Sequence, residues 1–296
     1  MNAQTGFELA REAHTGERLV VIGNGMAGCR AVEEILARDP ERYAITIFGA
    51  EPRVNYNRIM LSPVLAGEKS FDEIVLNTAE WYSENGIELV AGDPVDHIDR
   101  ERAVVIGRSG RVEPYDRLLI ATGSDPLIIP VPGRDLPGVV TFRDLDDVEK
   151  MLAAAGEGGN AVVIGGGLLG LEAAHGLALR GMAVTVVHLM PTLMERQLDE
   201  AAGWLLKTEL ERRGQTILTG ADTQEIIGKD GHVAGDRLKD GREIAADIVV
   251  MAVGIRPSTM LAKTAGLECE RGVMVDDHMV TSDPNVLAVG ECVQHR

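Results

Sequence analysis

The sequence predicts an α/β protein made of two Rossmann-like, three-layer dinucleotide-binding domains. A glycine fingerprint occurs twice, as GNGMAG over residues 23–28 and as GGGLLG over 165–170, each time directly after an apolar run. Each copy is followed much later by a similar closing segment, DRLLIATG over 116–123 and DIVVMAVG over 247–254. One such fingerprint alone is weak evidence, but two, each between a strand and a helix, indicate phosphate-binding turns. Two dinucleotide sites in one chain predict that electrons pass between two bound cofactors.

The first unit begins with an apolar strand over residues 19–22. A helix is expected from about 27 to 38, because apolar residues recur along one face at helical spacing. Asp39 ends this helix, since the residue before a proline disfavours the helical conformation. A second strand over 44–48 completes a right-handed parallel crossover.

The second unit follows a hinge over residues 137–143. A helix near 144–155 and a second strand over 183–187 are expected around its fingerprint. Two short strands near the end of the chain, at 273–276 and 286–291, need a sheet to join, and the first domain is the candidate. The second unit is therefore expected to be inserted within the first. The predicted divisions are a flexible tail over 1–17, a first domain over 18–140 and 258–296, and a second domain over 141–257.

The composition excludes several classes of protein. Twenty-nine Lys and Arg against 46 Asp and Glu give a net charge of -17, which argues against nucleic acid or an anionic membrane as a partner. The most apolar stretch, 161–179, is interrupted by Gly165, Gly166, Gly167, Glu172 and His175, so a buried strand, turn and helix are expected instead of a membrane span. The tail has no apolar core typical of a signal peptide. The three scattered cysteines have no metal-ligand spacing, so no metal site is expected and a reducing cytoplasm is predicted.

The glycines of each fingerprint have separate tasks. The first permits a tight turn, the second lets the backbone approach a pyrophosphate, and the third allows close packing of helix against strand. The diphosphate then lies on free N–H groups at the start of the helix, where the helix dipole favours negative charge. Glu51 follows the second strand and can accept hydrogen bonds from ribose hydroxyls. The alternative for Glu51 is a solvated loop carboxylate beside Pro52.

The second copy differs at its ribose end, where His188 stands at the usual position of an acid. It is expected to be a loop residue that borders the adenosine ribose and discriminates weakly between a hydroxyl and a phosphate. The choice between NADH and NADPH therefore stays open. Glu172, one turn into the helix, either reaches the nicotinamide end or is there only because the helix dipole favours it. A glycine turn that merely makes a corner is the alternative for this motif.

The paired fingerprints, Ala121-Thr122-Gly123 and the terminal TSDPNVLAVGE over 281–291 together resemble the FAD-dependent pyridine nucleotide-disulfide oxidoreductase superfamily, from about residue 18 onward. This resemblance implies that the first unit holds FAD and the inserted unit holds NAD(P)H. The implied FAD contacts are Gly23, Gly25, Met26, Ala27, Gly28, Glu51, Arg58, Val95, Ala121, Thr122, Gly123, Gly290 and Glu291. The implied NAD(P)H contacts are Gly165, Gly167, Leu168, Leu169, Gly170, Glu172, His188, Val253 and Gly254. Most relatives carry Asp in place of Glu291.

Within this superfamily two absences narrow the choice. The cysteine pair of the disulfide reductases is missing, and Pro63 replaces the lysine of the ferredoxin-reductase-like branch in the stretch YNRIMLSP. Residues 55–67, 187–199 and 290–292 resemble the large subunits of assimilatory NAD(P)H-nitrite reductases. This implies an electron-entry module, in which NAD(P)H gives a hydride to FAD. A later iron-sulfur and sirohaem module, outside these residues, would reduce nitrite to ammonia in nitrate assimilation.

No catalytic side chain is expected, because the hydride passes between cofactors. The resemblance also implies a homodimer of the full-length protein, and a helix after Gly290-Glu291 of which only 292–296 remain, so that FAD would be weakly held. Two alternatives stay open. The first is a free-standing NADH reductase for a rubredoxin- or ferredoxin-like protein, and the second is a flavin-binding interaction module without turnover.

Overall fold

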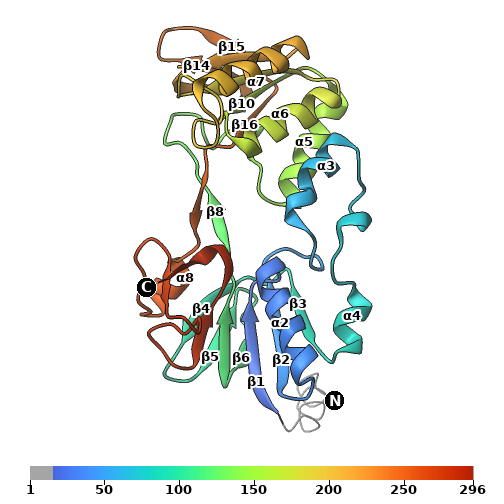
Figure 1. Ribbon diagram of the computed structural model, residues 1–296, viewed down its shortest axis with the longest axis vertical. Helices are drawn as coiled ribbons and strands as arrows, with labels where there is room; N and C mark the ends of the chain where they lie inside the picture. Colours follow the sequence, from blue (N-terminus) through green and yellow to red (C-terminus); the bar gives the residue numbers. More distant parts are fainter. Residues whose placement is uncertain (1–15, 296) are drawn as a thin grey trace. The chain divides into compact units, whose positions relative to one another are not determined.

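The computed structural model describes residues 16–295, which form two compact units (Figure 1). The first unit contains residues up to 57 together with 75–124 and 257–295, and the second contains 58–74 and 125–256. Residues 58–74 and 125–140 thus group with the second unit, whereas the sequence-based boundaries put them in the first. Residues 1–15 of the expected tail lie outside the described part, and Glu17 opens the first strand.

The first unit is built on a parallel sheet of the order β19-β7-β1-β2-β3. Alternate residues of β1 enter two different cores: Val20 and Ile22 pack with an antiparallel sheet on one face, and Leu19 and Val21 pack against α2 on the other. Burial on both faces explains why these strands are continuously apolar. The elements are β1 (Glu17–Ile22), α2 (Met26–Arg38), β2 (Tyr43–Gly49), α4 (Ala79–Glu84), β3 (Glu88–Ala91), β4 (Val95–Asp99), β5 (Val104–Gly107), β6 (Val112–Pro114), β7 (Arg117–Ile120) and β19 (Val286–Ala288).

The end of the chain differs from the sequence-based expectation. Of the two late strands, β19 joins the first sheet beside β7, but β18 (Val273–Val275) pairs in parallel with β20 (Val293–His295). Where the resemblance implies a helix after Gly290-Glu291, the described residues form no helical turn of the α type; they form the 3-10 turn η3 (Gly290–Cys292) and β20. Gly290 has a φ of 83°, which turns the chain, and the distant residues Val273, Val275 and Cys292 are all buried in the same core.

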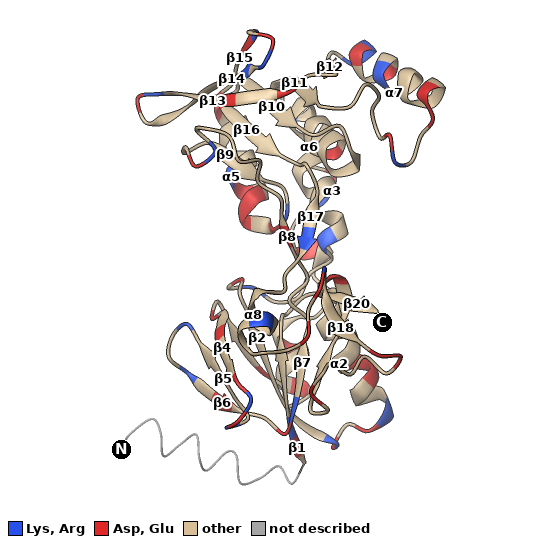
Figure 2. Ribbon diagram, turned by 90° about the vertical axis from the view of Figure 1, so that its left-hand side faces the viewer, with Lys and Arg blue, Asp and Glu red and all other residues tan. Residues whose placement is uncertain are grey.

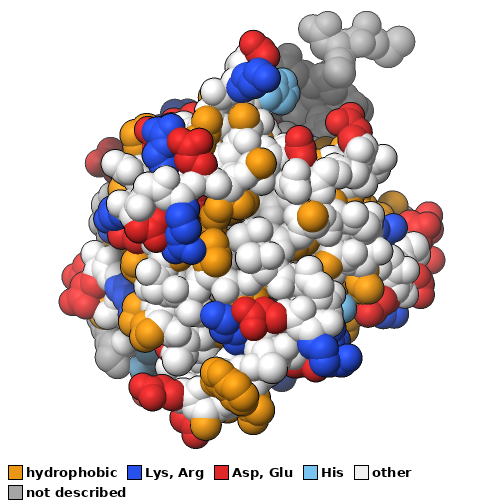
Figure 3. Space-filling model, turned by 90° about the horizontal axis from the view of Figure 1, so that it is seen from above, with side chains coloured by type: hydrophobic (Ala, Val, Ile, Leu, Met, Phe, Trp, Pro, Cys, Tyr) orange, Lys and Arg blue, Asp and Glu red, His pale blue; other side chains and the backbone are white. Residues whose placement is uncertain are grey.

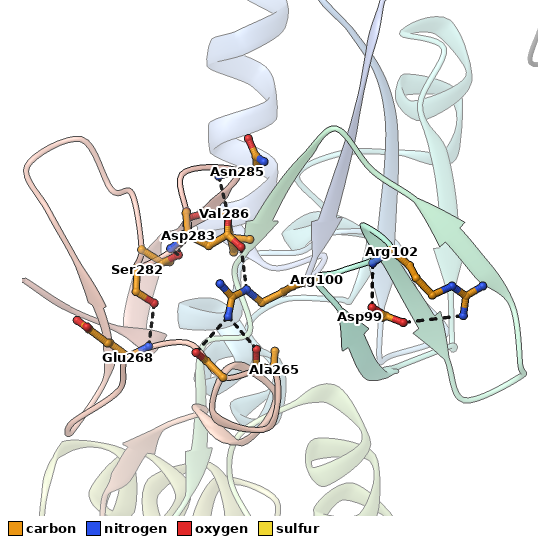
Figure 4. A network of polar contacts seen from close by, with 11 residues as sticks. Asp99, Arg100, Arg102, Ala265, Glu268, Ser282, Asp283, Asn285 and Val286 are labelled. Carbon is orange, nitrogen blue, oxygen red and sulfur yellow. Dashed lines mark hydrogen bonds and ion pairs between the residues drawn. The ribbon is translucent and has the colours of Figure 1, made fainter.

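Arg100, which directly follows β4, forms hydrogen bonds with residues 265–283 near the end of the chain (Figure 4). Its Nε donates to Oδ2 of Asp283 at 2.7 Å, and its Nη1 donates to the carbonyl oxygens of Ala265 and Gly266, both at 3.2 Å. The two carbonyls follow α8 (Met260–Thr264), and Asp283 precedes β19. One guanidinium thereby holds both sides of the segment that leads into β19.

The second unit repeats the plan of the first, with a parallel sheet of the order β12-β11-β10-β16-β9. An antiparallel sheet, β13-β14-β15, shares a core with it through Val162, Ile164, Leu238 and Val249. The predicted architecture of two Rossmann-like domains is therefore confirmed. The elements are β9 (Val139–Thr141), α5 (Leu145–Glu157), β10 (Asn160–Ile164), α6 (Leu168–Leu179), β11 (Ala183–His188), α7 (Glu200–Arg212), β12 (Thr216–Thr219), β13 (Thr223–Lys229), β14 (His232–Leu238), β15 (Glu243–Ala245) and β16 (Ile248–Met251).

Residues 58–74 belong to the second unit because α3 (Leu61–Ala66) packs on α6 and α5. Nε of Arg180 donates to the carbonyl oxygen of Leu65 at 2.7 Å, and a Cβ at Gly176 would lie 2.7 Å from Cγ of Leu65. This segment also contains η1 (Arg58–Met60) and η2 (Asp72–Ile74). The connecting strands β8 (Ser124–Pro126) and β17 (Ile255–Pro257) form a two-stranded sheet.

Charged residues of both signs are distributed over each unit (Figure 2). On the face seen in Figure 3, Lys and Arg side chains alternate with Asp and Glu, and no continuous basic area is formed there. Among the described residues, no helix has both the length and the apolar character that crossing a membrane requires.

Candidate dinucleotide-binding sites

The first glycine of each turn is required by the backbone. Gly23 and Gly165 have φ values of 115° and 123°, which side-chain-bearing residues rarely adopt. A Cβ on Gly23 would lie 2.2 Å from the carbonyl oxygen of Ala121, and one on Gly165 would lie 2.3 Å from that of Ala252. The closing segments of both units thus press directly against the first glycine.

The other two glycines divide the remaining tasks in the same way in both copies. A Cβ on Gly28 would lie 2.5 Å from the carbonyl oxygen of Gly23, and one on Gly170 would lie 2.0 Å from that of Gly165, so both are needed for close helix packing. The middle glycines, Gly25 and Gly167, have no neighbour within 4 Å of such a Cβ. Open space beside the turn is what a pyrophosphate needs in order to approach the backbone.

The helices that follow the two turns begin without a side-chain cap. Gly25 and Gly167 occupy the N-cap positions of α2 and α6, and neither helix has an acidic residue in its first turn. In contrast, α5 and α7 are capped by the carboxylates of Asp144 and Asp199. The N–H groups at the start of α2 and α6 are therefore available to an anion, which the helix dipole favours there. The predicted contact residues Met26, Ala27, Leu168 and Leu169 are the first residues of these helices.

The carboxylate of Glu51 is held in place by a buried tyrosine. The hydroxyl of Tyr56, which is 6% exposed, donates to Oε2 of Glu51 at 2.7 Å. The backbone of Glu51 is also bonded, since its carbonyl oxygen accepts from the N–H of Gly92 at 3.0 Å. This arrangement favours a positioned ribose ligand over a freely solvated loop carboxylate.

A buried polar network supports the first glycine turn from behind. Oδ1 of Asn24 accepts from the hydroxyl of Tyr82 at 2.7 Å and from the thiol of Cys29 at 3.1 Å, while its Nδ2 donates to the carbonyl oxygen of Arg53 at 3.1 Å. Burial raises the pKa of the Cys29 thiol to about 11, so the thiol keeps its proton and remains a donor. Sequence analysis missed Asn24 and Tyr82, although a polar residue between two glycines was a signal.

The end of the chain completes the first site. Oγ of Ser124 donates to Oε2 of Glu291 at 2.8 Å, and Oγ1 of Thr122 donates to the carbonyl oxygen of Ser258 at 2.9 Å. A Cβ on Gly290 would lie 2.8 Å from Cβ of Ala27, so residues 290–291 pass beside the first turn of α2. The structure thus brings together the predicted residues of the fingerprint, the closing segment and the chain end.

Two further predicted FAD contacts belong to other segments of the chain. Val95 begins β4 and packs against the core of the first unit. Arg58 belongs to the second unit, where its Nη1 donates to the carbonyl oxygen of Arg143 at 2.6 Å. In that same unit, Oε2 of Glu172 accepts from Oγ of Ser62 at 2.6 Å. Sequence analysis did not foresee the Ser62 contact, because it depends on the packing of α3 against α6.

The family model described as pyridine nucleotide-disulphide oxidoreductase matches residues 17–296. The chain belongs to this family. It is 54% identical over 280 residues to nitrite reductase [NAD(P)H] of Bacillus subtilis (strain 168), covering 95% of this chain and 35% of that protein. It is 48% identical over 281 residues to the assimilatory nitrate reductase electron transfer subunit of the same organism, covering 94% and 36%. The chain therefore spans about a third of the length of these two relatives.

A solved relative of this oxidoreductase family has the same fold. The putidaredoxin reductase–putidaredoxin complex superposes with a TM-score of 0.88 at 29% identity, covering 95% of this chain and 68% of that one. Members of the family are FAD-dependent NAD(P)H oxidoreductases, so the family resemblance and the enzyme class expected from the sequence are confirmed. Among the described residues no group of three or more His, Cys, Asp or Glu could hold a metal ion.

In this member of the family, His188 differs from the expected loop residue. It is the last residue of β11, and it is 7% exposed. Its Nδ1 accepts the backbone N–H of Gly166 at 3.0 Å, and its Nε2 lies 3.1 Å from the carbonyl oxygen of Thr192 and 3.1 Å from Oε2 of Glu195. Both ring nitrogens therefore have protein partners, and the imidazole supports the glycine turn.

Proposed function

We propose that this chain is the electron-entry flavoprotein module of an assimilatory NAD(P)H-nitrite reductase. One observation supports its redox role: two glycine turns with open space beside the middle glycine, each leading into an uncapped helix. The names of two relatives, a nitrite reductase [NAD(P)H] and an electron transfer subunit, support the choice of pathway. The iron-sulfur and sirohaem module that reduces nitrite to ammonia would lie outside these residues.

The residues of the first unit fit FAD. The open side of Gly25 and the N–H groups at the start of α2 would take the pyrophosphate, and Glu51 would accept from the ribose hydroxyls. Glu291, oriented by Ser124, would bond the ribityl chain. A bound flavin supplies the chemistry of accepting a hydride and releasing electrons singly, whereas these side chains bind and orient it.

The second unit would bind NAD(P)H in the corresponding way at Gly167 and the start of α6. Val253 and Gly254 follow β16, and Gly254 takes a φ of 116° while its carbonyl oxygen accepts from the N–H of Leu127 at 2.9 Å. Glu172 is the candidate for the nicotinamide end. We also propose a cytoplasmic location and a homodimer for the full-length protein.

Anaerobic reduction of the bound flavin tests this function. Purified protein reconstituted with FAD should lose the visible absorption band of the oxidised flavin when NADH is added without oxygen. Full binding of FAD without any loss of that band would refute the electron-entry role and would support a non-turnover flavin-binding module.

The acceptor requires a second measurement, made on the full-length protein. NADH-dependent consumption of nitrite is expected. If the full-length protein reduces an added rubredoxin- or ferredoxin-like protein and leaves nitrite untouched, a free-standing NADH reductase is the correct function.

A further inference from the structure

The segment that follows β11 is anchored to the second glycine turn at two points. The backbone N–H of Gly166 donates to Nδ1 of His188 at 3.0 Å, and its carbonyl oxygen accepts from the N–H of Met194 at 3.0 Å. A Cβ on Gly166 would lie 2.6 Å from Cδ2 of Leu193 and 2.7 Å from Cγ of His188. Both ends of the segment 188–194 thus contact Gly166, through His188 at one end and through Leu193 and Met194 at the other.

Glu195 follows the second anchor and returns to the same imidazole. Its Oε2 lies 3.1 Å from Nε2 of His188. Because Nδ1 of His188 accepts a hydrogen bond, the proton of the neutral ring is on Nε2, which donates toward Glu195 and the carbonyl oxygen of Thr192. The side chain of Glu195 is 31% exposed, against 9% for His188. A carboxylate is therefore held on the solvent side of the ring, at the carboxyl end of β11.

This end of the second strand is where the adenosine ribose lies in dinucleotide-binding domains. A carboxylate there accepts a hydrogen bond from the ribose 2′-hydroxyl and repels the 2′-phosphate of NADPH. The strand end itself carries an imidazole in this chain, and the negative charge comes from a residue seven positions later. We propose that Glu195, positioned by His188, selects NADH over NADPH.

This inference rests on the proposed binding of NAD(P)H by the second unit. It replaces the expectation of weak discrimination, which assumed that the His188 ring faces the ribose. Arg196, the next residue, carries the opposite charge and is exposed. A preference for the phosphorylated nucleotide would mean that this guanidinium, instead of the Glu195 carboxylate, faces the 2′ position.

The test is the ratio of the dissociation constants of NADP⁺ and NAD⁺, measured by calorimetry, because these oxidised nucleotides do not reduce the flavin. Glu195→Gln removes the charge but keeps an oxygen that can accept from Nε2 of His188. Glu157→Gln is the matched control, because Glu157 is an exposed residue at the end of α5, just before β10 begins, and so lies near the amino ends of the parallel strands, whereas Glu195 lies at the carboxyl end of β11. The same titrations with 2′,5′-ADP and 5′-AMP confine the comparison to the ribose half.

Wild-type protein should bind NAD⁺ at least about tenfold more tightly than NADP⁺. In Glu195→Gln the ratio of the dissociation constants of NADP⁺ and NAD⁺ should fall by about tenfold, because NADP⁺ binds more tightly. The affinity for 2′,5′-ADP should rise relative to that for 5′-AMP by a similar factor. Glu157→Gln should keep the wild-type ratio. An unchanged ratio in Glu195→Gln, or a wild-type preference for NADP⁺, would overturn the assignment while leaving nucleotide binding intact. Binding of neither nucleotide by the wild type would overturn the proposed function together with this inference.

Discussion

The N–H of Gly166 donates to Nδ1 of His188 at 3.0 Å. The equivalent place in the first unit is also filled by one side chain, but there the side chain comes from the glycine turn and not from the end of the strand. Gly23 N–H donates to the carbonyl oxygen of Phe48 and Gly165 N–H to that of Val187, which makes Gly49 the equivalent of His188 and Asn24 the equivalent of Gly166. A Cβ on Gly49 would lie 3.1 Å from Cβ of Asn24, whereas a Cβ on Gly166 would lie 2.7 Å from Cγ of His188.

Each turn therefore has room for one side chain at this place. In one unit the side chain belongs to the second residue of the glycine turn, and in the other it belongs to the last residue of the neighbouring strand. In the first unit the turn residue Asn24 provides it and the strand ends in Gly49. In the second unit the strand end His188 provides it and the turn residue is Gly166. Both arrangements match the same fingerprint, because only its first, third and sixth positions must be glycine.

His188→Ala should weaken the binding of NAD⁺ and reduce the preference for NAD⁺ over NADP⁺, because Glu195 also loses the ring that positions it. The variant leaves the buried N–H of Gly166 without its acceptor, which costs about 1–3 kcal/mol in a folded protein. A loosened turn should raise the dissociation constant of NAD⁺ by several-fold and lower the Tm by a few degrees. The dissociation constant of NADP⁺ should change less, because the released Glu195 carboxylate no longer repels the 2′-phosphate. Calorimetry and thermal unfolding measure both effects, and an unaltered Tm with full affinity would show that the ring does not support the turn.

Gly25→Val should separate flavin binding from folding. Gly25 has a φ of -90°, and no atom lies within 4 Å of the position that a Cβ would take, so valine is compatible with the fold of the apoprotein. In the open space, however, the side chain would occupy the place of the pyrophosphate. FAD affinity should fall by about a hundredfold or more, which corresponds to at least about 3 kcal/mol.

The matched variant for this experiment is Gly28→Val. A Cβ at Gly28 would lie 2.5 Å from the carbonyl oxygen of Gly23, so this substitution should unfold or strongly destabilise the apoprotein. Equilibrium dialysis against FAD and the Tm of the apoprotein distinguish the two. Retention of wild-type FAD affinity by a folded Gly25→Val protein would exclude this turn as the pyrophosphate site.

The features that could be predicted from the sequence are those fixed by local backbone chemistry. The strand expected over 19–22 and the helix expected over about 27–38 correspond to β1 and α2, because apolar periodicity and a glycine turn act within a few residues. The separate tasks of the three glycines were also visible, since each depends on the turn and on a closing segment with its own pattern.

What the sequence did not predict depends on contacts between distant residues. β18 pairs with β20 instead of the first sheet, because three-residue strands are directed by the core they enter. Residues 58–74 join the second unit through contacts of Leu65 with Arg180 and Gly176. The sequence around Leu65 contains no pattern that indicates these contacts. His188 was expected in a loop because the exchange of side chains with Gly166 becomes visible only when the two units are compared in space.

Asp236 should make the stability of the second unit depend on pH. The residue is 0% exposed on β14, its Oδ2 accepts from Oγ1 of Thr223 at 3.1 Å, and its Oδ1 is buried without a hydrogen-bond partner. Burial raises the pKa of this carboxyl from 3.8 to about 6, against a smaller opposing effect of the Thr223 hydrogen bond. The folded protein therefore binds a proton at a pH where the unfolded chain has already lost it.

The sign of the effect follows from this difference. Between about pH 6 and 3.8 the folded state holds more protons than the unfolded state, so the free energy of unfolding should rise as the pH falls through this window. Above about pH 6 the buried carboxylate is charged and the stabilisation is lost. Asp236→Asn cannot ionise, and its free energy of unfolding should therefore vary less between pH 6.5 and 4.5 than that of the wild type, by about 1–2 kcal/mol.

Denaturant unfolding at a series of pH values measures this difference. Asp240→Asn is the control, because Asp240 lies just beyond β14, is exposed and pairs with Arg242. Its pKa is lowered by the hydrogen bond from Arg242, so its ionisation falls below the window in question. The control should follow the wild-type curve from pH 6.5 to 4.5. If Asp236→Asn follows that curve as well, the Asp236 carboxyl keeps its charge throughout this range and the buried site must contain a compensating group.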